Sequence, residues 1–245
     1  VVPFPTRTAY SGFTSVRYSD YALLQATVTG QGKLLSGKEI VFTVHGSSLA
    51  IQTDTIGIAQ RVLRIESAPG THALRAEFPG DGYYYLPSSF VGSLEVLREN
   101  AVLSTFSATL VWPGTAAVAV AMPDDEGEAV LLQDEEPKTV HLEILENGAW
   151  KPIGRSRLAD GVAAFEAAIS TPTRLSCELR ARFEGDGRYN AAVSTGSLTI
   201  LDRSAPSIAI SSPQAGKTFA GAAAMEILFS VKDDLDPAPT SYAFL

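Results

Sequence analysis

The sequence predicts an all-β protein made of tandem β-sandwiches, and three observations support this fold class. Residues 72–84 recur as residues 177–189, at a shift of 105 positions. The repeated blocks alternate apolar and polar residues with a period of two, which is typical of antiparallel strands with one solvent-facing side. The chain has no long stretch with the 3.6-residue period of an amphipathic helix. A repeat of this length, made of short alternating segments, indicates successive domains.

Further blocks recur in the same order along the chain. They are residues 38–44 as 138–144, 57–59 as 161–163, and 92–94 as 196–198. The shift changes only between blocks, so insertions fall in the connections while the strands are kept. In the second copy, Leu175, Cys177, Leu179, Ala181 and Phe183 alternate with polar residues, and we expect them on the buried face. Short strands separated by Gly and Pro favour a β-sandwich.

These blocks carry a resemblance to a known family. Residues 18–28, Leu35-Ser-Gly-Lys38, Gly57-Ile-Ala59 and Gly80-Asp-Gly-Tyr-Tyr84 resemble bacterial immunoglobulin-like repeat domains. The resemblance covers residues 4–98 closely and residues 100–202 more loosely, because the segment from Val102 to Met122 departs from the pattern. It implies a sandwich of roughly seven strands without the antibody-type disulfide. It also implies tandem use in secreted or surface-anchored bacterial proteins, and no catalytic activity.

The repeat and the resemblance together predict the domain organisation. We expect an elongated array of two complete immunoglobulin-like domains, residues 4–98 and 100–202, followed by the N-terminal part of a third at 203–245. The third segment is too short for a sandwich of about 100 residues, so we expect the native protein to continue beyond it. The connections at 98–100 and 202–206 are short and leave little freedom between neighbouring domains.

Composition excludes several classes of partner. The formal net charge of −8 argues against nucleic acid and anionic membranes. No apolar run approaches the roughly 20 residues of a membrane-spanning helix. Cys177 is the single cysteine, so no disulfide forms within the chain, and we expect a buried, inert thiol.

Two acidic clusters are candidate calcium sites. Asp124 and Asp125 lie in a connection that is longer than its counterpart in the first copy. Asp233, Asp234 and Asp236 follow the last strand that the pattern predicts. Carboxylate oxygens are the ligands that calcium prefers, but a solvated acidic loop is the commoner explanation of each cluster. We expect no cofactor, and calcium is the one alternative that stays open.

Other polar and aromatic residues give weaker signals. Tyr83 and Tyr85, in a run of three tyrosines, are candidate contacts for a protein or glycan ligand. His45, His72 and His141 show no metal-ligand spacing, and the chain has no G-x-S-x-G nucleophile motif. We therefore expect no catalytic residues.

The sequence favours a structural spacer: an array of sandwiches in a larger extracellular or cell-surface bacterial protein, contacting neighbouring domains of the same chain. Three alternatives stay open. The array is an adhesin-like binding module for a protein or glycan, an accessory segment of a secreted hydrolase or toxin, or a subunit of a surface filament.

Overall fold

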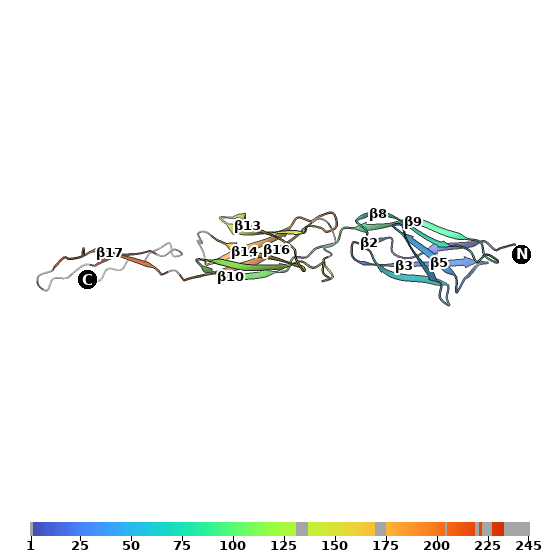
Figure 1. Cartoon of the computed structure of the whole chain (residues 1–245), viewed down its shortest axis with the longest axis horizontal. Coiled ribbons are helices and arrows are strands. Elements are labelled where there is room, and N and C mark those ends of the chain that lie inside the picture. Colours follow the sequence, from blue (N-terminus) through green and yellow to red (C-terminus); the bar gives the residue numbers. More distant parts are fainter. Residues whose placement is uncertain are drawn as a thin grey trace. The chain divides into compact units, whose positions relative to one another are not determined.

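The structure is a computed structural model that describes residues 2–130, 137–169, 175–203, 205–218, 221 and 227–232. Within these residues the regular elements are all β-strands, β1 to β18 (Figure 1). The described chain contains no helix long and apolar enough to cross a membrane. The prediction of an all-β fold built from tandem sandwiches is confirmed.

The described residues group into two compact units. Unit 1 contains residues 2–101, 124–130 and 184–191, and unit 2 contains residues 102–123, 137–169, 175–183 and the described residues from 192 onward. Unit 1 therefore holds two segments, 124–130 and 184–191, that belong by sequence to the second repeat.

Unit 1 is a sandwich of two sheets. Its strands are β1 (Thr6–Tyr10), β2 (Ser15–Arg17), β3 (Tyr21–Gly30), β4 (Lys33–Leu34), β5 (Glu39–Val44), β6 (Ser47–Gln52), β7 (Ile58–Arg64), β8 (Gly70–Phe78) and β9 (Ser88–Leu97). In one sheet β3 pairs antiparallel with β1, β7 and the short β4. The other sheet has the order β2-β9-β8-β5-β6, with β2 parallel to β9. Figure 1 shows β3 in one layer, with β8 and β9 in the other.

The core of unit 1 follows from the alternation in its strands. Leu24 and Val28 on β3 face Phe42 on β5 and Leu74 and Phe78 on β8, and all five are at most 1% exposed. Burial of such a side chain stabilises the fold by about 1.5–3 kcal/mol relative to exposure. The polar residues between them lie on the outer faces, so one period-two pattern fixes both the strand and its orientation.

Unit 2 repeats this strand order. Its strands are β10 (Phe106–Trp112), β11 (Thr115–Ala121), β12 (Thr139–Glu146), β13 (Ala149–Arg157), β14 (Val162–Ala168), β15 (Ser176–Phe183), β16 (Ala192–Asp202), β17 (Ser207–Ser212) and β18 (Leu228–Lys232). The sheet β10-β16-β15-β12-β13 matches β2-β9-β8-β5-β6 strand for strand, and β11-β14 matches β3-β7. The third segment is described only as the antiparallel pair β17-β18.

The first strand explains why the second repeat departs from the sequence pattern between Val102 and Met122. In unit 1 the chain pairs first with β3 through β1 and then with β9 through the three-residue β2. In unit 2 the seven-residue β10 pairs with β16 along its whole length, from Phe106 to Trp112. The two units thus share the strand order of the five-stranded sheet, but the N-terminal segment is divided into two strands in unit 1 and forms one long edge strand in unit 2.

Burial in β15 agrees with most of the predicted inward face. Leu179, Ala181 and Phe183 are at most 2% exposed, and Cys177 is half-buried. Cys177 pairs with Leu198 as His72 pairs with Leu94, so the aligned residues occupy equivalent positions. The prediction that Leu175 is buried is wrong, because this residue precedes the strand and is 59% exposed.

Candidate metal centre

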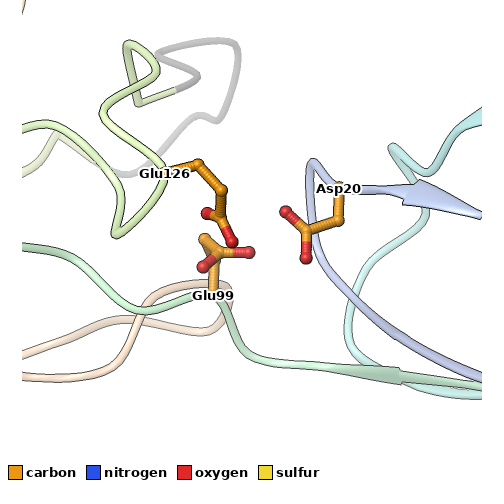
Figure 2. Close-up of side chains that lie close together, drawn as sticks. All are labelled: Asp20, Glu99 and Glu126. Atoms are coloured by element: carbon orange, nitrogen blue, oxygen red, sulfur yellow. The ribbon is translucent and has the colours of Figure 1, made fainter.

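Three carboxylates lie close together in unit 1. Asp20, Glu99 and Glu126 each offer one carboxylate oxygen, and these atoms lie within 4.8 Å of one another. Figure 2 shows the three side chains reaching from separate segments of the chain toward a common space. Since the residues are far apart in the sequence, the fold, and not their spacing, brings them together.

Asp20 is placed by a turn between β2 and β3. Ser19 adopts the left-handed conformation, with φ of 69°. Its N–H donates to the carbonyl of Ile65 at 2.8 Å, and the N–H of Ile65 donates to the carbonyl of Asp20 at 2.8 Å. Arg64 Nε also donates to the carbonyl of Ser19 at 2.8 Å. These bonds fix the backbone beside the half-buried Asp20 carboxylate.

Glu99 is held by a parallel bridge to Tyr189. Its N–H donates to the carbonyl of Arg188 at 2.8 Å, and the N–H of Asn190 donates to the carbonyl of Glu99 at 2.7 Å. The residue is 0% exposed. Its Oε1 accepts a hydrogen bond from the N–H of Asn100 at 2.6 Å, whereas its buried Oε2 has no hydrogen-bond partner among the described residues. A buried carboxylate oxygen without a donor is costly, so Glu99 is the unusual member of the cluster.

Glu126 lies in a tight turn at residues 124–128. The N–H of Glu128 donates to Asp124 Oδ1 at 2.6 Å, and the N–H of Asp124 donates to the carbonyl of Glu128 at 2.9 Å. Gly127 has φ of 86°, which a glycine adopts without strain. Asp124 is thus a turn-forming residue, and the turn leaves the Glu126 side chain exposed toward the cluster.

The side chain of Asn100 links the segments beneath the cluster. Its Nδ2 donates to Asp125 Oδ2 at 2.7 Å. Its Oδ1 accepts from Asn190 Nδ2 at 2.8 Å and from Arg17 Nη1 at 3.4 Å. Arg17 Nη1 also donates to the carbonyl of Arg98 at 2.6 Å. Four segments of unit 1 therefore meet at one amide.

Burial and neighbouring charges change the acidity of the cluster. Burial raises the pKa of Glu99 to about 8, and the carboxylates of Asp125 and Asp20 act in the same direction. The pKa of Asp20 is also raised, first by burial and then by the charges of Asp125 and Asp124, against an opposing effect of Arg17. At neutral pH and without a cation, Glu99 therefore retains its proton.

Asp125 and Glu126 shift in opposite directions. The hydrogen bond from Asn100 lowers the pKa of Asp125, which stays ionised. The hydrogen bond between Glu126 and Asp125 is the main cause that raises the pKa of Glu126. Without a cation, the cluster thus reduces its negative charge by retaining a proton on Glu99.

This arrangement suits a hard divalent cation. Two oxygens bound to one calcium ion at about 2.4 Å are at most about 4.8 Å apart, which is the limit that the three ligand atoms meet. All the donors are oxygens, which favours calcium over zinc or copper. Calcium takes 6–8 oxygen ligands, so water or bidentate carboxylates would complete the shell.

The predicted metal ligands fall into two groups. Asp124 and Asp125 border the cluster, yet the three residues with converging oxygens include neither of them. Asp125 instead accepts from Asn100, and Asp124 closes its turn. Asp233, Asp234 and Asp236 lie outside the described residues.

The predicted aromatic contacts also differ from one another. Tyr83 is 77% exposed and Tyr84 is 60% exposed, whereas Tyr85 is half-buried. Lys38 Nζ lies 5.1 Å from the centroid of the Tyr85 ring and pairs with Asp81 Oδ2 at 2.8 Å. Tyr85 thus packs against its own sandwich, and Tyr83 and Tyr84 project from it.

The structure also brings together two histidines, His45 and His72, whose contact the sequence did not predict. His45 Nδ1 and His72 Nδ1 lie 2.8 Å apart, and His72 Nε2 lies 2.7 Å from the carbonyl of Ala68. The register of β5 with β8, in which Val44 faces Leu74, is the signal that brings them together. Among the described partners of these rings no carboxylate orients either imidazole, as a nucleophile–base–acid arrangement requires.

No family model matches the chain, and no curated protein matches it. Similar solved structures include a tetra-tandem repeat from the extending region of a large adhesion protein, at 15% identity over 93% of this chain and 55% of that chain, with a TM-score of 0.39. A 1.5-MDa bacterial ice-binding adhesin matches at 14% identity over 82% of this chain and 66% of that chain, with a TM-score of 0.34. The Yersinia pseudotuberculosis adhesin InvE matches at 12% identity over 78% and 58%, with a TM-score of 0.35.

The chain spans 55% to 66% of the length of these three structures. Two of these structures are described as adhesins and one as a large adhesion protein. With identities under 25% and TM-scores under 0.5, they carry no argument about what this chain binds or does.

Proposed function

We propose that this chain is a non-catalytic structural spacer, an array of immunoglobulin-like domains in a larger bacterial extracellular or cell-surface protein. The domains of this proposal are residues 4–98 and 100–202, with a third beginning at 203. The matching order of the two five-stranded sheets supports the array. We expect no cofactor other than calcium, for which unit 1 offers carboxylate ligands.

The observation that carries the proposal is the way in which segments of the second repeat pack into unit 1. Residues 184–191 lie between β15 and β16 in the sequence, yet they belong to unit 1 by their contacts. Tyr189, in this segment, and Tyr18 are both at most 1% exposed. The chain thus enters unit 1 more than once, and successive repeats share several covalent connections. A spacer under tension gains from such connections, because no single linker carries the whole force.

A replacement experiment tests the spacer role. In the parent protein, these residues are exchanged for an unrelated array of immunoglobulin-like domains of equal length. A spacer predicts that display and activity of the remaining protein persist, and that a shorter array reduces them. Loss of activity with the length-matched array would contradict the proposal.

One surface favours adhesin-like binding as the second candidate. Phe4, Tyr83, Tyr84 and Leu86 are 40%, 77%, 60% and 43% exposed. The N–H of Phe4 donates to the carbonyl of Tyr84 at 2.7 Å, and the N–H of Leu86 donates to the carbonyl of Phe4 at 2.9 Å, so these residues form one patch. Exposed tyrosines in a patch are typical contacts for proteins and glycans.

Binding is tested with the immobilised chain on a glycan array and on surface proteins of candidate host cells. The binding reading predicts a signal that Tyr83→Ala and Tyr84→Ala abolish. Val91→Ala is the control, since Val91 is 73% exposed on β9. A signal that all three variants retain would remove this patch from consideration.

A further inference from the structure

We propose that Asp20, Glu99 and Glu126 bind one calcium ion in unit 1, and that the ion holds the segments around residues 20, 99 and 126 together. The three oxygens already lie within the span that one ion can bridge. The inference does not depend on the spacer role, because it concerns the ligands alone.

The burial of Glu99 is the independent observation that points to a ligand. Glu99 is 0% exposed, and its Oε2 has no hydrogen-bond partner among the described residues. Glu99 nevertheless faces the two further carboxylates of Asp20 and Glu126 (Figure 2). An ionised carboxylate buried in this way costs free energy unless a cation or a donor compensates it, and without either Glu99 keeps its proton at neutral pH. A calcium ion between the three side chains supplies that compensation.

The first repeat shows that the fold itself does not require an acid at this position. The N–H of Phe4 donates to the carbonyl of Tyr84, and Phe4 bridges Tyr85 in parallel. The N–H of Glu99 donates to the carbonyl of Arg188, and Glu99 bridges Tyr189 in parallel. Phe4 and Glu99 thus occupy the same backbone position in the two repeats. An apolar residue satisfies this position in one repeat, so the carboxylate in the other has a separate role.

Among the described residues, basic side chains contribute no ion pair to the cluster. In the part of the chain that the structure describes, the ion pairs involve neither Asp20, Glu99 nor Glu126. Arg17 is the basic residue that lowers the pKa of Asp20, but its Nη1 donates to the carbonyl of Arg98 and to Asn100 Oδ1. The negative charge is therefore available to an ion.

The surrounding turns orient the ligands in advance. Ser19 and Ile65 fix the backbone of Asp20, and the bridge to Tyr189 fixes Glu99. Glu126 is exposed and completes the site from the turn at residues 124–128. Two ligands with a fixed backbone and one exposed side chain thus supply three oxygens, and water would fill the remaining positions.

The test is calorimetric titration of the full chain with CaCl₂ near neutral pH and physiological ionic strength. We expect one ion per chain, with a dissociation constant between about 1 μM and 1 mM. Glu99→Gln and Glu126→Gln are each expected to weaken binding about tenfold or more, through the loss of one charged ligand. Glu95→Gln, at an exposed position on β9, is the matched control and is expected to bind as the unchanged chain does.

Folding of each variant is checked by circular dichroism. Glu126→Gln keeps the test decisive if Glu99→Gln does not fold, because Glu126 is exposed. Calcium is also expected to raise the melting temperature of the unchanged chain and to leave that of the binding-defective variants unchanged. Absence of binding by the unchanged chain overturns the proposal. So does unchanged affinity in Glu126→Gln, or an equal loss in Glu95→Gln.

Discussion

Tyr18 and Tyr189 pack edge to face inside unit 1, with ring centroids 5.6 Å apart and an interplanar angle of 86°. Both rings are at most 1% exposed. Arg188 lies over the Tyr18 ring, 5.2 Å from its centroid, and its Nη1 donates to the Tyr18 hydroxyl at 3.2 Å. Tyr18 follows β2 in the first repeat, and Tyr189 precedes β16 in the second. This pair joins residues of both repeats in one core.

Tyr189→Ala is expected to destabilise unit 1 by about 3–5 kcal/mol, because it leaves a cavity beside Tyr18. Tyr83→Ala is the matched control and is expected to change stability by no more than about 0.5 kcal/mol, since its ring is exposed. Urea unfolding of the full chain, followed by tyrosine fluorescence and circular dichroism, measures both, because Trp112 and Trp150 lie in unit 2. Equal stabilities of the two variants would show that Tyr189 does not belong to this core.

Two glycines of the same loop give a second contrast. Gly185 has φ of 82°, and a Cβ there would lie 2.9 Å from the N of Ala191 and 3.0 Å from the carbonyl oxygen of Tyr189. At Gly187 a Cβ would meet nothing within 4 Å. Gly185→Ala should therefore cost about 1–3 kcal/mol, and Gly187→Ala should cost much less.

Thermal denaturation of both variants checks this prediction. A melting temperature for Gly185→Ala that matches that of Gly187→Ala would contradict the loop conformation.

The Asp81 carboxylate makes the stability of the fold depend on pH in the acid range. Its Oδ1 accepts from the N–H groups of Tyr83, Tyr84 and Tyr85, and its Oδ2 pairs with Lys38. The bond from Lys38 and these backbone bonds hold its pKa well below the usual 3.8. The unfolded chain therefore binds this proton more readily, so this contribution to stability is present above about pH 4 and is lost as the pH falls below it.

Asp81→Asn is expected to be less stable than the unchanged chain at pH 6, and the difference should shrink below about pH 3. Denaturant unfolding across this range measures it. A difference that stays constant with pH would show that the charge of Asp81 contributes nothing.

Whereas the Asp81 carboxylate stabilises the fold, the ionised Glu99 carboxylate is expected to destabilise it when no metal ion is bound. In excess chelator at about pH 9, Glu99→Gln should be more stable than the unchanged chain by about 1–3 kcal/mol, because a neutral amide replaces a buried carboxylate. Glu95→Gln should change stability by no more than about 0.5 kcal/mol. Destabilisation by Glu99→Gln under these conditions would indicate that the carboxylate serves the metal-free fold.

The sequence predicted the repeat architecture well, because a period of two determines which side chains a sandwich buries. The aligned pair His72 and Cys177 occupies equivalent positions on β8 and β15. Leu175 was misplaced, since alternation says nothing about where a strand begins.

The shift of 105 also misaligned one pair of tyrosines. It matches Tyr84 with Tyr189, but Asp81 N donates to the carbonyl of Tyr85 as Asp186 N donates to that of Tyr189. The first loop is one residue longer, so Tyr85 is the structural counterpart. A single inserted residue inside a turn leaves no trace in the apolar pattern.

The candidate metal site could be predicted only in part. The acidic connection pointed to Asp124 and Asp125, which border the cluster. Asp20 and Glu99 gave no signal, because each is a single acid in a short connection of ordinary composition. The equivalence of Phe4 and Glu99 would have singled out Glu99 as an unusual acid. This equivalence is visible only in the structure, because it rests on the bridges to Tyr85 and Tyr189.

The most direct measurement of the central claim is anomalous diffraction from crystals of the chain grown with CaCl₂. The account predicts one anomalous peak with oxygens of Asp20, Glu99 and Glu126 at about 2.3–2.6 Å. Calcium bound elsewhere, with these three carboxylates holding no ion, would contradict it.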